Sequence, residues 1–263
     1  MSVELERRIE ELVVDEYFRD PPRFVATMAT APTRAVAKAF VLEWTKFSRL
    51  FPRWVGAVMA NCPEFDVLAF EVENLMSEVV RDPASNTNHY ELLIRLGAAL
   101  GLGREQIEAH DPCPEAQDAF EYWWAMARQE DWLLGFAAVN GLEILGDRSL
   151  PRRHGLAPTT GLEVDPWARL ALPDEALEFF RVSSEADVGH GNASVQLLAR
   201  HTPEGRGNVV LGVLSETIVK VRTMMDGLWA LAERLEAGDQ AAERARAQMG
   251  EQAPEQTPRE ERA

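Results

Sequence analysis

The chain has 263 residues, of which 46% are hydrophobic and 27% charged, so it can bury one sizeable core and does not require two domains. Its formal net charge of −16 repels phosphate backbones and anionic lipid, so nucleic acid and membrane are not expected as main partners. The sequence has no run of about 18 apolar residues and no basic-then-apolar leader. It therefore predicts neither a membrane span nor a signal peptide, and we expect a cytoplasmic protein.

Apolar residues recur at helical spacing along most of the chain. The pattern predicts helices over residues 3–18, from 33 to Pro52, and over 64–78, 89–100, 115–145, 177–198 and 208–235. Pro52 is expected to interrupt the second of these helices. No segment shows the two-residue period of a strand, so the sequence predicts an all-α, single-domain bundle of about seven core helices.

Two segments lack this periodicity. Residues 146–173 contain four prolines and no sustained pattern, which predicts a loop or lid. From residue 238 the chain is charged and then Pro-rich, a composition that cannot offset the entropy of ordering. We therefore expect a helical bundle domain over 1–237 and a charged, disordered tail over 238–263.

The stretch 177–198 carries polar residues on the helix face that should be apolar. Between Phe180 and Leu197, its inner stripe contains Ser183, Asp187, His190 and Ser194. A buried polar group without a partner costs roughly 2–7 kcal/mol, so Asp187 and His190 need partners or a metal ion. Their spacing places both side chains on one helix face, as metal binding requires. A structural Asp–His pair would give the same pattern.

Other ionisable residues lie beside helix faces made of Leu, Phe and Trp. With the pair above, the set is Glu78, His89, Glu143, Asp187 and His190. Carboxylates and imidazoles that converge inside a helical bundle are the ligand set of a non-haem iron or manganese pair. Structural explanations also exist. Glu78 could be exposed on an acidic helix, as could Glu71. His89 could simply follow a helix cap, and Glu143 could pair with a nearby arginine.

The order and spacing of these residues resemble a known family. The matching motifs are Asn74-Leu-Met-Ser-Glu78, His89-Tyr-Glu-Leu-Leu followed by Leu100-Gly-Leu102, then Glu143, then Phe180 with Asp187-x-x-His190. They are similar to the haem-oxygenase-like di-iron oxidases and oxygenases, iron-containing redox enzymes similar to pyrroloquinoline-quinone synthesis protein C. The likeness spans residues 64–229.

The resemblance implies a bundle that binds two Fe(2+) ions and uses dioxygen to oxidise a small-molecule substrate. Such enzymes act on an amino acid or fatty acid, by desaturation, C–C cleavage or N-oxygenation, in biosynthesis. By matching motif positions, Glu78 and His89 would be the first carboxylate and imidazole ligands, Glu143 the bridging carboxylate, and Asp187 and His190 the last pair. The family's final motif has a histidine four residues before the aspartate, where this chain has Ser183, so a sixth ligand is missing.

Other function classes stay open on the sequence. A metal-free relative of the same fold could oxidise a cofactor precursor or, like type II thiaminases, use a cysteine thiolate. The two cysteines, Cys62 and Cys113, each begin Cys-Pro-Glu at a predicted helix start. A non-catalytic binding protein that has lost a ligand is a further class. The chain could also assemble as a homodimer.

Overall fold

Helices form all the regular secondary structure that the computed structural model describes, which covers residues 2–82, 84–157 and 159–251. For residues 2, 184–187, 243 and 245–251 the description is limited to the backbone. The elements are α1 (Ser2–Val13), π-helix η1 (Val14–Phe18), α2 (Arg23–Thr30), α3 (Arg34–Asn61), α4 (Phe65–Leu75), π-helix η2 (Met76–Val80), α5 (His89–Ala99), α6 (Arg104–Ala109), α7 (Pro114–Ala127), α8 (Trp132–Gly146), α9 (Ser149–Arg153), α10 (Val164–Ala168), 3-10 helix η3 (Asp174–Leu177), α11 (Glu178–His201) and α12 (Gly207–Glu251). These ranges contain no strand, so the predicted all-α fold is confirmed. Nor does any helix within them have the length and apolar character needed to cross a membrane.

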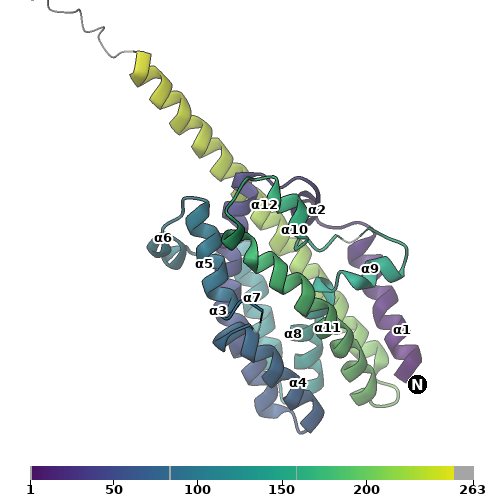
Figure 1. The fold of residues 1–263 in the computed structure, drawn as a ribbon. Helices are drawn as coiled ribbons and strands as arrows, with labels where there is room; N and C mark the ends of the chain where they lie inside the picture. The colour runs from purple at the N-terminus through teal and green to yellow at the C-terminus, as the bar shows by residue number, and fades with distance from the viewer. Residues whose placement is uncertain (1, 83, 158, 252–263) are drawn as a thin grey trace, which may run out of the picture.

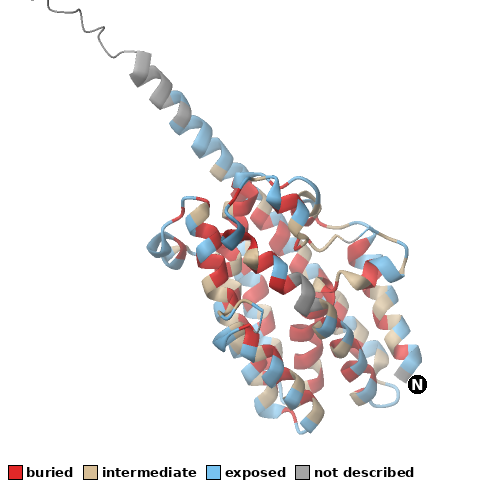
Figure 2. Ribbon diagram, viewed as in Figure 1, coloured by how far each residue is buried: buried red, intermediate tan, exposed pale blue. Residues whose placement is uncertain are grey.

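Helix α8 packs against α3, α7, α11 and α12 and is buried on nearly all sides. Figure 2 shows buried residues along the inner faces of the bundle and exposed residues on its outer faces. A helix that is apolar all round is typical of a core position. Asn140 and Glu143 of α8 therefore lie in an apolar interior.

Helix α3 carries a row of aromatic rings along one face. Thr33 caps its start by accepting a hydrogen bond from the Val36 amide. Steps of four and three residues align the rings, and consecutive centroids lie 5.2, 4.7 and 5.5 Å apart along Phe40, Trp44, Phe47 and Phe51. This row becomes one wall of the cavity described below.

Pro52 does not interrupt α3, so that prediction is wrong, and the helix continues to Asn61. An internal proline removes a backbone hydrogen bond and costs about 3 kcal/mol. Phe51, Trp54 and Val55 are buried around it, and their burial offsets the cost.

Two predicted helices have a different form in the structure. The helix expected over 115–145 is split into α7 and α8 by residues 128–131. Helix α8 folds back closely on the end of α7. The spacing at Gly135 shows this, since a Cβ added there would lie 2.9 Å from the Met126 carbonyl oxygen. The helix expected over 64–78 ends in η2, whose wider turn carries Glu78.

Helix α12 is longer than predicted and projects from the bundle (Figure 1). It continues past Gly238 to Glu251, and residues 236–242 are exposed. Ala, Glu, Gln and Arg dominate this segment, and their high helix propensity accounts for a helix without an apolar stripe. The division into a bundle over 1–237 and a tail over 238–263 stays a prediction, and residues 252–263 lie outside the described part.

Helices α8 and α11 approach each other closely beside His190. A Cβ added to Gly191 would lie 2.6 Å from the Asp147 Cβ and 2.9 Å from the Glu143 carbonyl oxygen. No larger residue fits there without moving backbone. The contact therefore sets where the neighbouring His190 side chain stands relative to Glu143.

Replacing Gly191 with alanine should force α11 away from α8. We expect Gly191→Ala to lower the free energy of unfolding by about 1–3 kcal/mol in denaturant titrations, the usual cost of overpacking a core. Gly189→Ala is the matched control, because a Cβ at Gly189 would have no atom within 4 Å. It should stabilise the helix by roughly 0.5–1 kcal/mol. Equal stability of the two variants would contradict the close contact.

Candidate metal centre

Glu78 and His89 come together from η2 and the first residue of α5. Glu78 Oε1 lies 2.7 Å from His89 Nδ1, and the imidazole is buried. His89 does follow a cap, since the Asn88 side chain accepts a hydrogen bond from the Glu91 amide. The other ring nitrogen, Nε2, lies 3.8 Å from Asp82 Oδ2, and the neighbouring His89 lowers the pKa of Asp82. The imidazole thus lies between two carboxylates.

Glu143 and His190 are neighbours on α8 and α11. His190 Nδ1 lies 3.5 Å from Glu143 Oε2, and Asn74 Nδ2 donates a hydrogen bond to Glu143 Oε1 at 3.0 Å. Burial raises the pKa of Glu143, but the hydrogen bond and charge of His190, together with Asn74, outweigh burial and leave the pKa below its ordinary value. Glu143 is therefore an ionised carboxylate inside the core.

Glu71 is the residue of this site that the sequence interpretation did not select. It is fully buried on α4, where an exposed acidic position had been allowed. Burial raises the pKa of Glu71 to about 8, against the lowering effect of a hydrogen bond from Asn140. Within the described part of the chain, its Oε2 has no hydrogen-bond partner. The available signal was its spacing of seven residues from Glu78, two turns along one helix face.

Two reciprocal amide–carboxylate hydrogen bonds join α4 to α8. Glu71 and Asn74 lie three residues apart on α4, as do Asn140 and Glu143 on α8, so each pair shares a helix face. Asn140 Nδ2 donates to Glu71 Oε1 at 2.7 Å, and Asn74 donates to Glu143. Ser194 of α11 donates to Asn140 Oδ1 at 3.4 Å. Three helices therefore hold the two carboxylates in place.

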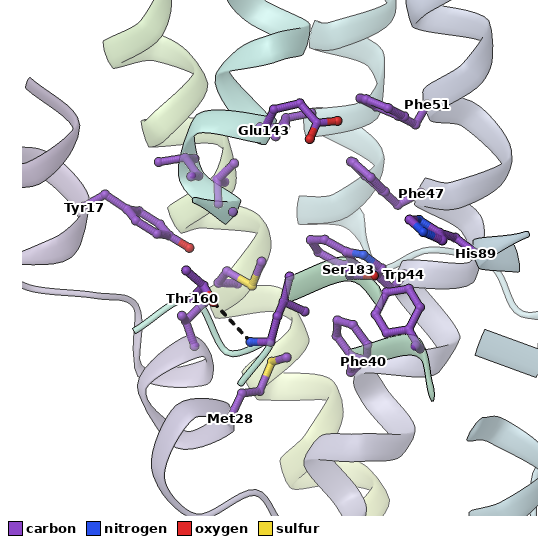
Figure 3. A pocket seen from close by; sticks show the side chains of 18 of the residues that line it. Tyr17, Met28, Phe40, Trp44, Phe47, Phe51, His89, Glu143, Thr160 and Ser183 are labelled. Atoms are coloured by element: carbon purple, nitrogen blue, oxygen red, sulfur yellow. Dashed lines mark hydrogen bonds between the residues drawn. The ribbon is translucent and has the colours of Figure 1, made fainter. Parts of the chain in front are cut away.

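A cavity of about 110 Å³ borders this set (Figure 3). Its wall is mostly aromatic and aliphatic, and it includes the Phe40, Trp44 and Phe47 row. The acidic, imidazole and serine groups on its wall are Glu78, His89, Glu143 and Ser183. Figure 3 shows His89 and Ser183 across the cavity from Tyr17. Glu78, His89 and Glu143 thus face this cavity, whereas Glu71 and His190 are not among the described residues that line it.

The structure brings four of the five predicted ligands to one region, as the Glu78–His89 and Glu143–His190 pairs. Asp187 lies in α11, but its side chain is not among the described parts of the structure. Ser183 is buried at the cavity, and its hydroxyl has no partner among described residues. The ligand role of each residue stays a prediction.

Two other histidines lie away from the cavity. His110 Nε2 is 3.0 Å from the buried Glu43 Oε1, and the His110 side chain is half-buried. His201 Nε2 lies 3.0 Å from both carboxylate oxygens of Asp66. With Glu64 they form a partly exposed group whose donor atoms lie within 4.8 Å of one another, an arrangement common on surfaces without a metal.

The buried donor set has the chemistry of a metal site, but within the described part of the chain the donor atoms that already lie within 4.8 Å of one another are those of Glu64, Asp66 and His201. Leaving the Glu71 Oε2 atom buried without a partner costs about 1–3 kcal/mol, and the nearby Glu143 carboxylate disfavours a second negative charge. A divalent cation relieves both penalties, because ionised carboxylates and imidazoles are its ligands. Nitrogen and oxygen donors of this kind suit iron or manganese.

The sequence is similar to one protein family and to several curated proteins. A family model described as iron-containing redox enzyme matches residues 38–216. A curated 4-aminobenzoate synthase from Chlamydia pneumoniae is 24% identical over 172 residues, which cover 65% of this chain and 70% of the relative. The 4-aminobenzoate synthase of Chlamydia muridarum is 21% identical over 197 residues, covering 73% and 78%.

Solved structures share the fold. A Shewanella denitrificans domain of unknown function with a heme oxygenase-like fold superposes with a TM-score of 0.64 at 13% identity, covering 89% of this chain and 93% of that one. A TenA homologue from P. horikoshii gives a TM-score of 0.62 at 15% identity, covering 88% and 99%. At such low identity these likenesses concern the fold alone.

In protein freed of metal, Glu71 should make stability depend on pH. The folded state has a pKa of about 8 against an ordinary value of 4.5, so it keeps a proton that the unfolded chain releases between these values. Stability therefore falls as pH rises from 4.5 to about 8. The Glu71→Gln variant cannot lose this proton, so it should melt several degrees above the unmodified protein at the upper end of this range and nearly with it at the lower end.

Glu73→Gln is the control, because Glu73 is exposed on the same helix. Melting scans at both ends of the range should show little effect of this substitution. An effect of Glu71→Gln that does not vary with pH would contradict the raised pKa.

Proposed function

Because the chain belongs to the iron-containing redox enzyme family, we propose that it is a non-haem di-iron oxidase or oxygenase that uses dioxygen to oxidise a small metabolite. At the level of the family it is an oxidoreductase with a haem-oxygenase-like fold, and relatives named as synthases indicate a role in biosynthesis. The proposed substrate is of amino acid or fatty acid type. The proposed reaction is a desaturation, C–C cleavage or N-oxygenation.

The observation that carries this proposal is the set of buried and half-buried carboxylates and imidazoles beside an aromatic cavity. Glu71, Glu78, His89, Glu143 and His190 would hold iron, with Asp187 as the further ligand expected from sequence. Bound ferrous iron would supply the electrons that reduce dioxygen. Asp82, on the far side of the His89 ring, would orient that imidazole. Asn74 and Asn140 would do the same for the carboxylates.

Besides a metal, an oxidation requires a site that excludes water and holds the substrate, and the wall of the cavity would supply it. The apolar wall excludes water and keeps a substrate beside the donor set. In protein without metal, the Glu78 and His89 side chains share a hydrogen between Oε1 and Nδ1, and a metal ion held by both residues would take the place of that hydrogen.

A cysteine mechanism of the thiaminase kind is not supported by the described site. Cys113 caps α7 with Pro114 at the first helical position, as predicted, whereas Cys62 ends α3. Burial raises the pKa of Cys113 to about 12 and also raises the pKa of Cys62. Neither thiol is among the described residues that line the cavity. A metal-free oxidase and a binding protein stay as the alternatives.

Iron should stabilise the folded protein, because a metal that binds only the folded state adds its binding free energy to stability. Anaerobic Fe(2+) at about a hundred times its Kd should add about 2.7 kcal/mol and raise the melting temperature. Mn(2+) should act likewise. Glu143→Ala and His190→Ala should abolish the rise, and Asp187→Ala should do so if Asp187 is a ligand.

Iron retained after gel filtration gives the second measurement, with more than one equivalent expected per chain. The control is His201→Ala, which removes the surface group of Glu64, Asp66 and His201 and should leave the iron content unchanged. A protein that retains no iron would be a metal-free oxidase or a binding protein. Iron lost with His201→Ala alone would place the metal at the surface.

Ser183→His should raise the metal affinity of the position that lacks its sixth ligand. A serine hydroxyl is a poor iron donor compared with an imidazole, and Ser183 faces the cavity one turn before Asp187. The substitution restores the family's spacing of a histidine four residues before the aspartate. Metal titrations should show higher occupancy of the second ion. Full occupancy by two ions in the unmodified protein, unchanged by the new histidine, would mean that Glu71 or another residue already completes the site.

A further inference from the structure

Tyr17 presents a hydroxyl to the cavity at a point that the metal chemistry does not use. The residue lies in η1, is 3% exposed, and lines the cavity. Figure 3 shows its ring on the opposite side from His89, with the hydroxyl toward the interior. Burial raises the pKa of Tyr17, so the hydroxyl stays protonated. It makes no hydrogen bond within the described part of the chain. It is therefore available to a ligand.

The charges around this end of the cavity disfavour an anionic ligand group. The described residues that line the cavity include neither Lys nor Arg. Arg222 is the cation whose charge reaches Tyr17. Its guanidinium, however, donates to the backbone oxygens of Glu16 and Asp20 and to the Asp20 carboxylate. A carboxylate placed beside Tyr17 would therefore be desolvated without a dedicated partner, which is costly.

The volume of the cavity and its aromatic wall limit the size and shape of the ligand that it can hold. A volume of about 110 Å³ is comparable to the roughly 150 Å³ of a cavity that takes up benzene. The Phe40, Trp44 and Phe47 rings stack along one side, and stacked rings favour a flat aromatic neighbour. Of the two proposed substrate types, a compact amino acid fits this volume better than a long fatty acid does.

We propose that the cavity takes a small, single-ring substrate whose end remote from His89 carries an uncharged hydrogen-bonding group paired with the Tyr17 hydroxyl. Tyr17 is then a specificity-determining residue, which selects hydroxyl- or amine-bearing rings and rejects carboxylates at that end. That the ligand is a substrate rests on the proposed function. Its recognition by Tyr17 does not depend on a bound metal.

The test compares two probes that differ by one hydroxyl, toluene and 4-methylphenol, by titration calorimetry with metal-free and with Mn(2+)-loaded protein. A neutral hydrogen bond makes a roughly twofold to tenfold difference in Kd. We expect 4-methylphenol to bind more tightly than toluene by that factor, and Tyr17→Phe to remove the difference while leaving toluene binding unchanged. Tyr90→Phe is the matched control, because the Tyr90 hydroxyl bonds Glu108 at the surface.

A preference for 4-methylphenol that survives Tyr17→Phe would overturn the inference. So would metal-free protein that binds 4-methylbenzoate more tightly than 4-methylphenol, since Arg222 would then be the anchor. These results are separate from iron retention. A Tyr17-dependent preference in a protein that fails to retain iron after gel filtration supports the recognition and refutes the di-iron function.

The unmodified protein offers a second measurement if Tyr17→Phe folds poorly. The chain has three tyrosines, so 13C labelling at tyrosine Cζ gives a resolvable Tyr17 resonance. Addition of 4-methylphenol should shift that resonance further than toluene does. Equal shifts with both probes would contradict a hydrogen bond to Tyr17.

Discussion

Carboxylates inside an apolar core must be neutralised or hydrogen-bonded, and this constraint organises the contact between α4 and α8. Glu71 and Glu143 lie in that interior, and each accepts a hydrogen bond from an asparagine of the opposite helix. His190 of α11 adds a second partner for Glu143, with Nδ1 3.5 Å from Oε2. The arrangement satisfies most donors and acceptors but leaves Glu71 Oε2 without a partner among described residues. A cation is the chemical group that would complete it.

The same constraint separates the cavity into two chemical environments. Carboxylates and imidazole gather where α5, η2, α8 and α11 meet, because those helices carry the polar positions of otherwise apolar faces. The aromatic face of α3 and the Tyr17 ring of η1 form the rest of the wall. A ligand is thus held by apolar contact along its body and by polar groups at its ends. Pockets of this composition are typical of sites for small organic molecules.

Helical periodicity predicted the all-α class and most helix positions, but it missed features set by neighbours in space. The break between α7 and α8 depends on the close approach at Gly135, which no single-helix pattern contains. Continuation of α3 through Pro52 depends on the burial of Trp54 and its neighbours. The π-helical turn at Glu78 likewise lies inside a segment whose pattern is ordinary.

The sequence by itself determined which residues could form the site, because Glu78, His89, Glu143 and His190 are polar groups on faces that have to be buried. It also located Ser183 as the departure from the family's ligand pattern. Tertiary structure alone decided which of them pair, that Glu71 joins them instead of facing solvent, and that Tyr17 lies across the cavity. Helical spacing specifies the face on which a side chain lies. The partner that face meets is set by the packing of helices distant in sequence, as in the pairing of Glu71 with Asn140.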